Sequence, residues 1–488
     1  MGHDMTVRLD KHFAIGRQSR VWPQGWTSVA FGPFHIAHGE SIRRYAVTDG
    51  DGAVRGYILG WLVGPDGLLA SGSHIQTPAE DVAFVRWSAT LCGRFVCLLR
   101  EGDRVRLYPD PCGLLGVVYA PAAGTVASIP ELLTGTTPDT ALQRAIGVPQ
   151  RFGWYPFGLT PHIGARRLMP NFALDLSQFE ARRFFPTEAH PLVPNDDAAS
   201  TLGRIGRAVS EAVASMCGDP RAVVHLTAGR DSRMVLGAAL ASGARPTVVT
   251  VTIPTAGAKV DAIVAGRLAA RAGLQHELRP FIPATAADLE EWYERTGRCV
   301  SDHVAGLATT LKSWDRDELQ VTGTGGEIAR AFYWTEADRT APRPDARAVL
   351  MRLGLPVAPQ TLDAAEAWLG TLPSVAAATL WDLAYIEQRL GCWAGPATYG
   401  STMALPSLSP FNSRAVVEAI LSLPEQTRLG NILARHLIVG AGQGLLRIPF
   451  NRLPGLDSLR FPRLAAKSLL PTSIKSALKN TSVLLGSR

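Results

Sequence analysis

Residues 222–241 read AVVHLTAGRDSRMVLGAALA, and their pattern indicates how the second half of the chain folds. Ala222–Leu226 is an apolar run rich in valine, which predicts a buried strand. A helix is predicted from Ser232 to about Ala241, with Gly243 at its end. The turn between them holds small residues, so its backbone N–H groups can come close to a ligand. We therefore expect an anion-binding turn between this strand and this helix.

The same alternation of strands and helices continues toward the C-terminus. We expect strands at 247–252, 276–279 and 320–322, helices at 259–272 and 288–296, and mainly helical chain from 362 to 444. Such alternation is typical of a parallel sheet that helices cover on both faces. The sequence therefore predicts an α/β protein whose second domain has a parallel sheet.

The first 190 residues have the pattern of a layered antiparallel β domain. Tyr45–Thr48 and Val54–Val63 are apolar runs on either side of an Asp-Gly-Asp-Gly turn, which predicts a hairpin. Phe95–Leu99 and Val105–Tyr108 flank a Gly-Asp turn in the same way. These hairpins predict a sheet of antiparallel strands.

A proline-rich stretch from 185 to 197 separates the two patterns. We place the domain boundary there, so the expected domains are 1–190 and 195–488. Asn195 or Asp196 is the expected cap of the next helix, because short polar side chains accept hydrogen bonds from a helix start.

The composition is that of a globular protein. No run of eighteen apolar residues is free of charge, and the first ten residues lack the apolar segment of a secretory signal, so we expect a cytoplasmic protein.

The six cysteines lie far apart and form neither a CxxC pair nor a zinc-type cluster. Buried, reduced thiols are therefore expected.

The positive charge is concentrated at the C-terminus. The formal net charge is +7, and 447–488 holds eight basic residues and one acidic residue, so this tail carries the whole excess. Phe461–Asn480 has a weakly amphipathic pattern that Pro471 interrupts. We predict a basic helical tail that helps to hold an acidic partner or substrate; a helix packed back on the second domain is the alternative.

Three side chains in the turn after Leu226 point to a polyphosphate. Thr227 and Ser232 supply hydroxyl groups that can donate hydrogen bonds to phosphate oxygens. Asp231 would repel bare phosphate, so its presence is explained if it holds Mg²⁺. An ordinary strand-to-helix turn with Ser232 as a cap is the other interpretation, and the turn alone leaves both open.

This turn resembles the pyrophosphate loop of the asparagine synthetase and β-lactam synthetase family, which also includes the lasso-peptide cyclases. The family pattern is Ser-Gly-Gly-x-Asp-Ser. Thr227 stands at its first position, Ala228 and Gly229 at the two glycines, and Asp231 and Ser232 match directly.

Two later segments resemble the same family in order and spacing. Residues 261–276, from Asp261 to His276, resemble its second helix and the Gly-x-x-His that follows. Residues 323–328 resemble its Gly-x-Gly-Ser-Asp-Glu loop. The loop is one residue short and lacks the aspartate, so Glu327 is the carboxylate left for a second metal contact.

The N-terminal half resembles a class II glutaminase domain. Cys92–Phe95 and Leu107–Gly113 are similar to its Gly-x-Phe and Arg-Asp-Pro-x-Gly segments, and Val126–Ser128 with Glu131 is similar to its Phe-Ala-Ser-Glu. Such a glutaminase uses an N-terminal cysteine, whereas this chain reads Met1-Gly2-His3. We therefore expect a degenerate glutaminase-like domain that does not hydrolyse glutamine.

The resemblance implies an ATP-dependent carbon–nitrogen ligase with a PP-loop, Rossmann-like nucleotide-binding domain, which uses ATP and Mg²⁺ and releases AMP and pyrophosphate. It would adenylate a substrate carboxylate and pass it to an amine, in a peptide or a small natural product. Lasso-type macrocyclisation is one form of this reaction. The resemblance implies metal contacts at Asp231 and Glu327, and ATP or pyrophosphate contacts at Leu226, Thr227, Ala228, Gly229, Arg230, Asp231, Ser232, Arg233, Thr252, Gly323, Gly325 and Gly326.

For the acyl-transfer step, the resemblance implies two residues, and each of them has an alternative structural role. A Tyr/Glu pair serves as base in some relatives, for which the resemblance implies Tyr385 and Glu387 in a helix predicted at 376–390. A packed aromatic ring and a solvated charge are the alternatives for these two side chains. Gly430–Arg435 stands where the family has a lysine, and it contains none.

Two other functions stay open. A tRNA-modifying enzyme of the same nucleotide-binding fold would suit the basic tail, but thiolation chemistry uses paired cysteines, so nucleic acid is not an expected partner. A catalytically degenerate family member that binds a peptide or a partner protein would explain Ala228, the shortened loop and the missing lysine. The sequence leaves homo-oligomerisation open.

Overall fold

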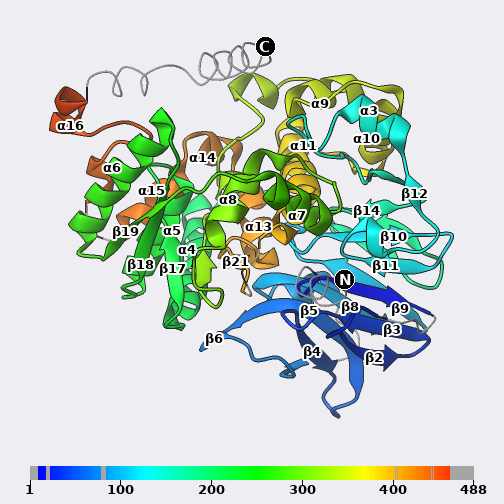
Figure 1. The fold of residues 1–488 in the computed structure, drawn as a ribbon. Coiled ribbons are helices and arrows are strands. Elements are labelled where there is room, and N and C mark those ends of the chain that lie inside the picture. The colour runs from blue at the N-terminus through cyan, green and yellow to red at the C-terminus, as the bar shows by residue number, and fades with distance from the viewer. Residues whose placement is uncertain are drawn as a thin grey trace.

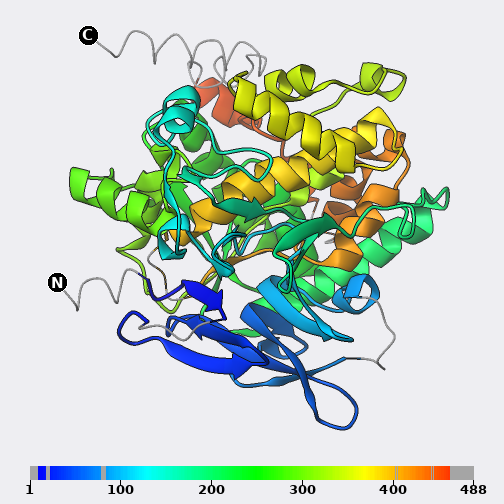
Figure 2. The same ribbon diagram turned by 90° about the vertical axis from the view of Figure 1, so that its right-hand side faces the viewer.

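The computed structural model describes residues 9–17, 22–77, 84–401, 403, 405–440, 442 and 444–461. Within them the protein is of the mixed α/β class, with antiparallel sheets in the N-terminal half and a parallel sheet later in the chain (Figure 1). Figure 2 shows the N-terminal strands, in blue, below the helices of the second half. The predicted basic tail, beyond residue 461, lies outside the described residues.

Two sheets form the N-terminal half. The six-stranded sheet has the order β14 (Arg166–Leu168), β10 (Val117–Ala120), β11 (Thr125–Ala127), β1 (Phe13–Gly16), β3 (Phe34–His38), β2 (Thr27–Phe31). The larger sheet has the order β16 (Glu180–Arg183), β15 (Phe172–Asp175), β9 (Arg104–Pro109), β8 (Gly93–Glu101), β5 (Val54–Gly64), β4 (Arg43–Thr48), β7 (His74–Gln76), and β6 (Gly67–Leu68) pairs with β5. β12 (Thr137–Pro138) and β13 (His162–Ile163) form a separate pair, and the short helices α2 (Phe84–Ser88) and α3 (Thr140–Ile146) complete this half.

Both predicted hairpins are confirmed, since β4 pairs antiparallel with β5 and β8 pairs antiparallel with β9. The central strands β5 and β8 are buried on both faces. Leu59 and Val96 belong to the main core cluster, whereas their neighbours Ile58 and Cys97 belong to a second cluster on the opposite face. This division follows from the period of two along a strand, which sends successive side chains to opposite faces.

The second half contains a five-stranded parallel sheet, as predicted. Its order is β19 (His276–Pro280), β18 (Thr247–Thr252), β17 (Ala222–His225), β20 (Leu319–Val321), β21 (Ser407–Leu408). Helix α4 (Ala198–Gly218) precedes the first strand of this sheet, and the crossover helices include α5 (Asp231–Ala241), α6 (Ala256–Ala272), α7 (Ala286–Thr296) and α8 (Ala305–Leu311). The side chain of Asp197 caps α4 by accepting from Ser200 N, so the predicted cap at Asn195 or Asp196 is wrong by one or two residues.

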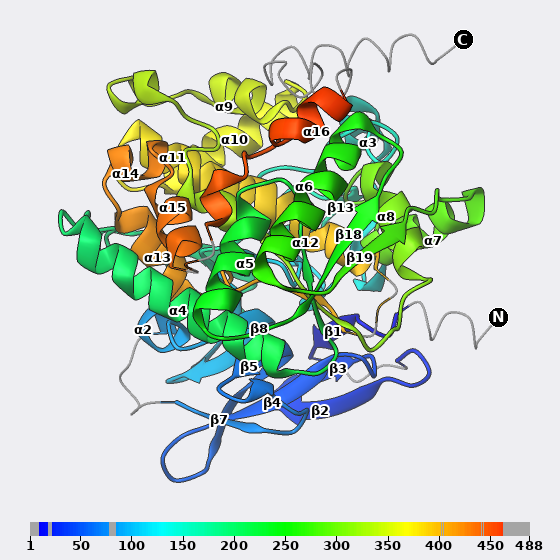
Figure 3. The same ribbon diagram turned by 90° about the vertical axis from the view of Figure 1, so that its left-hand side faces the viewer.

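Helices cover both faces of this sheet, as expected for a parallel sheet. Val224 and Val248 point into the main core on the side of α4, α5 and α6, which Figure 3 faces. Val223 and Val249 pack on the other side, where Leu311 of α8 contacts the same small cluster. The chain order reverses between β17 and β20, because β18 and β19 follow β17 on one side whereas β20 and β21 lie on the other.

The rest of the chain is mainly helical, as expected. Its helices are α9 (Ala346–Leu353), α10 (Pro359–Thr371), α11 (Ala377–Ala384), α12 (Gly395–Tyr399), α13 (Arg414–Ser422), α14 (Glu425–Leu429), α15 (Ile432–Val439) and α16 (Gly455–Arg460). The helix predicted at 376–390 is α-helical only to Ala384 and continues as a π-helix over Tyr385–Ala394. The wider turn of a π-helix changes the directions of its side chains, and such segments are common at functional sites.

One core runs through both halves of the molecule. The main cluster of buried apolar side chains includes Phe13 and Trp61 from the N-terminal sheets and Leu226 and Leu437 from the second half. All six cysteines are free; four of them are buried, as expected, whereas Cys92 and Cys217 are only partly buried. Among the described residues, no helix combines the length and the apolar character needed to cross a membrane.

Candidate functional site

Two loops meet where the order of the parallel sheet reverses. The first follows β17 and runs from Leu226 to Arg230; the second follows β20 and contains Gly323, Gly325 and Gly326. Because neighbouring crossovers leave in opposite directions at such a point, the ends of the two strands border an open crevice. The predicted nucleotide loop and the predicted glycine loop therefore lie at the usual ligand position of an open parallel sheet.

Hydrogen bonds within the first loop fix its shape. Thr227 N donates to Ser232 Oγ at 3.1 Å, the Thr227 and Ser232 hydroxyls lie 3.0 Å apart, and Gly229 N donates to Thr227 Oγ1 at 3.1 Å. Ala228 N donates to Asp261 Oδ1 at 2.8 Å. Side chains thus already hold the amides of Ala228 and Gly229, which leaves the first turn of α5 as the main source of N–H donors for an anion.

Arg233 supports the loop from behind and is not free to reach a phosphate. Its side chain is fully buried, and its guanidinium donates to the carbonyl oxygens of Leu445, Pro449 and Ala228. Its Cζ lies 4.2 Å from the centre of the Phe450 ring. Arg233, expected as a polyphosphate contact, instead fastens the segment after residue 444 to the loop.

The glycine loop packs directly on the start of α5. A Cβ at position 323 would lie 2.6 Å from the carbonyl carbon of Asp231, and one at position 326 would lie 3.1 Å from the Asp231 Cβ. Gly325 has φ +87°, a left-handed conformation that glycine adopts without strain. These contacts explain why the loop needs glycine: any larger residue would separate the two loops.

Two carboxylates and one guanidinium lie together beside these loops. Arg330 Nη2 is 3.2 Å from Asp231 Oδ2 and 3.8 Å from Glu327 Oε1, so Arg330 links the two predicted metal ligands. Burial raises the pKa of Glu327, and the nearby charge of Asp231 raises this pKa further. Arg330 was not singled out from the sequence. Its position three residues after Glu327 is the spacing that could have indicated this ion pair.

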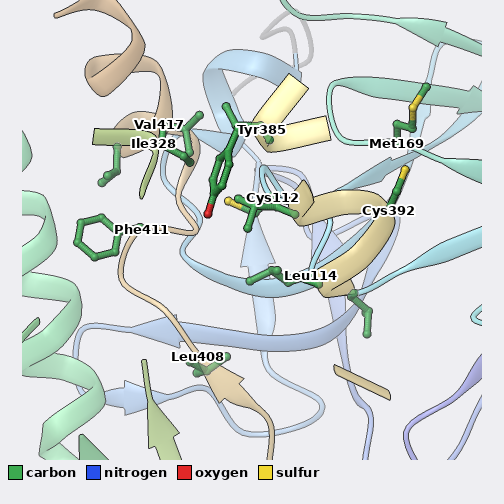
Figure 4. Packing of buried hydrophobic residues seen from close by; sticks show 14 of the residues in the cluster. Cys112, Leu114, Met169, Ile328, Tyr385, Cys392, Leu408, Phe411 and Val417 are labelled. Atoms are coloured by element: carbon green, nitrogen blue, oxygen red, sulfur yellow. The ribbon is translucent and has the colours of Figure 1, made fainter. Parts of the chain in front are cut away.

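Tyr385 also belongs to this cluster. Its pKa is raised well above the ordinary range, first by burial and then by the charge of Glu327, to which its hydroxyl is hydrogen-bonded. Figure 4 shows the Tyr385 ring between Val417 and Cys112, with Ile328 and Phe411 nearby. Tyr385 therefore contacts the glycine loop, and it stays neutral at ordinary pH.

The predicted pairing of Tyr385 with Glu387 is not formed. Glu387 is fully buried, and its two oxygens accept hydrogen bonds from Arg183 at 2.6 and 2.8 Å, from Asn171 at 2.8 Å and from Trp368 Nε1 at 2.6 Å. Glu387 is thus part of an interior ion pair. The carboxylate beside Tyr385 is Glu327, because the π-helix turns the two side chains in different directions.

The remaining predicted residues lie at the edges of the crevice. The Leu226 carbonyl accepts a hydrogen bond from Thr250 Oγ1 at 2.7 Å, and Thr252 Oγ1 donates to the Arg279 carbonyl at 3.2 Å. Burial, and then the nearby Arg330, lower the pKa of Arg230. Arg230 and Arg330 both line a pocket of 310 Å³ that Arg428 and Asn431 also border.

These residues fit a divalent cation in composition. Mg²⁺ is usually held by one or two carboxylates together with substrate phosphate oxygens and water. Asp231 and Glu327 provide the two carboxylates, while no group of three or more His, Cys, Asp or Glu ligands occurs in the described part of the chain. Arg330 would have to turn away from both carboxylates for a cation to bind.

Comparison of the chain with protein-family models gave no match, and comparison with curated proteins gave no significant match.

Proposed function

We propose that the protein is an ATP-dependent carbon–nitrogen ligase that adenylates a substrate carboxylate and transfers the acyl group to an amine. The observation that carries this proposal is the contact between the loop after β17 and the glycine loop after β20 at the point where the sheet order reverses. Open parallel sheets bind their ligands in such a crevice. The proposal includes a PP-loop, Rossmann-like second domain at 195–488 and a degenerate glutaminase-like first domain at 1–190.

In this proposal the nucleotide phosphates lie at the start of α5. The first-turn N–H groups and the dipole of an eleven-residue helix favour negative charge there. Thr227 and Ser232 orient the loop by their mutual hydrogen bond. Arg230 and Arg330 bring positive charge to the same end of the crevice.

Asp231 and Glu327 would hold Mg²⁺, which when bound neutralises the charge that develops on the leaving pyrophosphate. Tyr385, with its raised pKa, keeps its proton and orients the Glu327 carboxylate through their hydrogen bond. Arg330 lies beside both carboxylates in the free protein and is near enough to contact phosphate oxygens once it turns from them. The substrate acid and amine would be parts of a peptide or a small natural product.

A second function is supported by a specific observation. Side chains already occupy the amides of Ala228 and Gly229, and Arg330 occupies the position between the two carboxylates. A catalytically degenerate protein that binds a peptide or a partner protein would have such a closed site. The two functions differ in whether Mg²⁺ and ATP bind at all.

Titration calorimetry with Mg²⁺ and a non-hydrolysable ATP analogue tests the proposal. We expect the wild type to bind, and Asp231→Asn to bind at least tenfold more weakly, because one metal ligand loses its charge. The melting temperature should change little, since a partly exposed ion pair contributes only about 0–1 kcal/mol. Asp363→Asn, at an exposed position on α10, is the control; equal affinity in all three proteins, or no binding by the wild type, would contradict the ligase.

A further inference from the structure

A separate cavity of 220 Å³ lies between the two halves of the molecule. Its wall combines Arg94 of β8, Trp292 of α7, Gln320 of β20 and Trp393 of the π-helix, together with Thr324 from the glycine loop. The cavity beside the parallel sheet is thus lined by segments that are distant in the chain. None of the residues that the proposed nucleotide reaction uses lines this cavity.

The cavity wall contains buried donors that have no acceptor. Arg94 is 2% exposed, and its Nε and Nη2 have no hydrogen-bond partner among the described residues. The indole Nε1 atoms of Trp292 and Trp393 are likewise buried and unpartnered there. Buried N–H groups of native proteins nearly always have a partner, so this concentration of donors indicates an acceptor inside the cavity.

The surroundings are also positive. Lys11 is 1% exposed, and its ammonium donates to the carbonyl of Ser401, a residue of the cavity wall. Asp10, the neighbouring acid, pairs with Arg295 and Arg316. In the described part of the chain no carboxylate lies within 4.0 Å of the charged groups of Lys11 or Arg94.

Aromatic rings and the Asp110 carboxylate, which lies beyond ion-pair distance, compensate the Arg94 charge only in part. Its Cζ lies 5.6 Å from the centre of the Trp61 ring and 5.5 Å from that of Tyr399, which gives cation–π attraction. Ring faces leave the N–H groups themselves without acceptors, and a buried guanidinium needs both charge compensation and hydrogen bonds. An oxyanion would supply both.

We propose that this cavity is a binding site for a small carboxylate, with Arg94 as its main anchor. The volume suits a ligand of about eight non-hydrogen atoms, since a cavity of about 150 Å³ can hold benzene. Leu307, Ala308 and Leu311 of the wall suit a short aliphatic part. Thr324 joins the cavity to the glycine loop, so a bound acid would lie next to the crevice, but its binding does not depend on the nucleotide reaction.

Thermal melting and titration calorimetry of the full chain with sodium butyrate, without nucleotide, test this site. We expect saturable binding in the millimolar range and a rise in melting temperature. Butylamine hydrochloride and sodium chloride at equal ionic strength should give neither. An effect of the chloride that matches that of butyrate, or equal effects of butyrate and butylamine, would overturn the proposal.

Two variants identify the site. Arg94→Met should weaken butyrate binding at least tenfold, and Leu307→Trp should do so by filling the cavity without altering any charge. Leu307 is only half-buried, so this second variant keeps the test available if Arg94→Met does not fold. Arg104→Met, at a side chain that is 53% exposed on β9, is the control and should bind butyrate normally. Wild-type affinity in Leu307→Trp would refute the assignment, whereas loss of ATP binding alone would not.

Discussion

Glu387 is surrounded by donors from three distant segments. Arg183 approaches from β16, Asn171 from the turn before β15 and Trp368 from α10, and together they occupy both carboxylate oxygens. The Arg183 guanidinium is also nearly fully buried, at 3% side-chain exposure. If one member of such a buried ion pair is removed, the other charge stays buried without compensation and the protein is destabilised.

Glu387→Gln should therefore lower the free energy of unfolding by about 3–5 kcal/mol, because it leaves the Arg183 charge uncompensated in the interior. Urea unfolding measures this loss, with Glu366→Gln at an exposed position of α10 as the control. Nucleotide affinity of the folded fraction should not change. Unaltered stability with lost adenylation would instead give Glu387 a catalytic role.

His225, at the end of β17, makes stability depend on pH. Burial, helped by the nearby Arg279 charge, lowers the pKa of His225 to about 4, whereas an ordinary histidine has a value of 6.5. Between these values the unfolded chain binds the proton and the folded chain does not, so stability falls as pH drops from 6.5 toward 4.

Between pH 7 and pH 5 the free energy of unfolding should fall by about 1–2 kcal/mol more in the wild type than in His225→Gln. The variant lacks the imidazole that takes up a proton when the wild type unfolds. Urea unfolding at the two pH values gives the comparison. The exposed His190→Gln serves as the control. Equal losses in His225→Gln and the wild type would show that this histidine is not the group responsible.

At the scale of elements, the start of α5 and the glycine loop after β20 form one unit. Gly323 lies against the Asp231 backbone, where an added Cβ would be 2.8 Å from both its carbonyl oxygen and Ser232 N. Real Cβ atoms do not come so close to backbone, so a side chain here must move the helix or the loop.

Gly323→Ala should cost about 1–3 kcal/mol of stability through this overlap and should also weaken nucleotide binding. Gly370→Ala is a matched control, because Gly370 lies in α10 with no heavy atom within 4 Å of the added Cβ. That change should stabilise the helix by about 0.5–1 kcal/mol. Similar melting temperatures for the two variants would contradict the proposed packing of the loops.

The order of strands and helices in the parallel sheet could be predicted because apolar residues recur with clear periods. Valine runs gave β17 and β18, and Gly273 marked the end of α6, where it adopts φ +65°. The π-helix could not be predicted, because its start at Tyr385 depends on how α11 packs on other elements. For the same reason the predicted partner of Tyr385, Glu387, is wrong, and Glu327 lies beside Tyr385 instead.

At the scale of the whole molecule, Asn412 fastens the two halves together. Its Nδ2 donates to the Gly93 carbonyl at 2.6 Å and to Asp110 Oδ1 at 2.9 Å, and its Oδ1 accepts from Cys112 N at 3.1 Å. Asn412 is 1% exposed and follows β21, whereas its partners belong to the N-terminal half. The shared core cluster gives the same connection over a larger area.

We therefore expect a single unfolding transition in calorimetry, because neither half encloses its core without the other. Asn412→Ala should lower the free energy of unfolding by about 3 kcal/mol, since it leaves buried backbone groups without partners. Asn195→Ala is the control, because the Asn195 side chain bonds to Thr201 Oγ1 and Asp197 N, both in the segment next to it. Two separate transitions in the wild type would mean that the halves fold independently.

The α/β class, the hairpins, the parallel sheet and the position of the two loops could be predicted, because they depend on local periods of apolar residues and on glycine. The sequence also singled out Asp231, Glu327 and Tyr385, although without their contacts. The interior roles of Arg233 and Glu387, and the place of Arg330 between the two carboxylates, became visible in the folded protein alone. The reason is physical: a charged side chain has the same local pattern whether it faces a crevice or is buried against partners, and only long-range packing brings those partners to it.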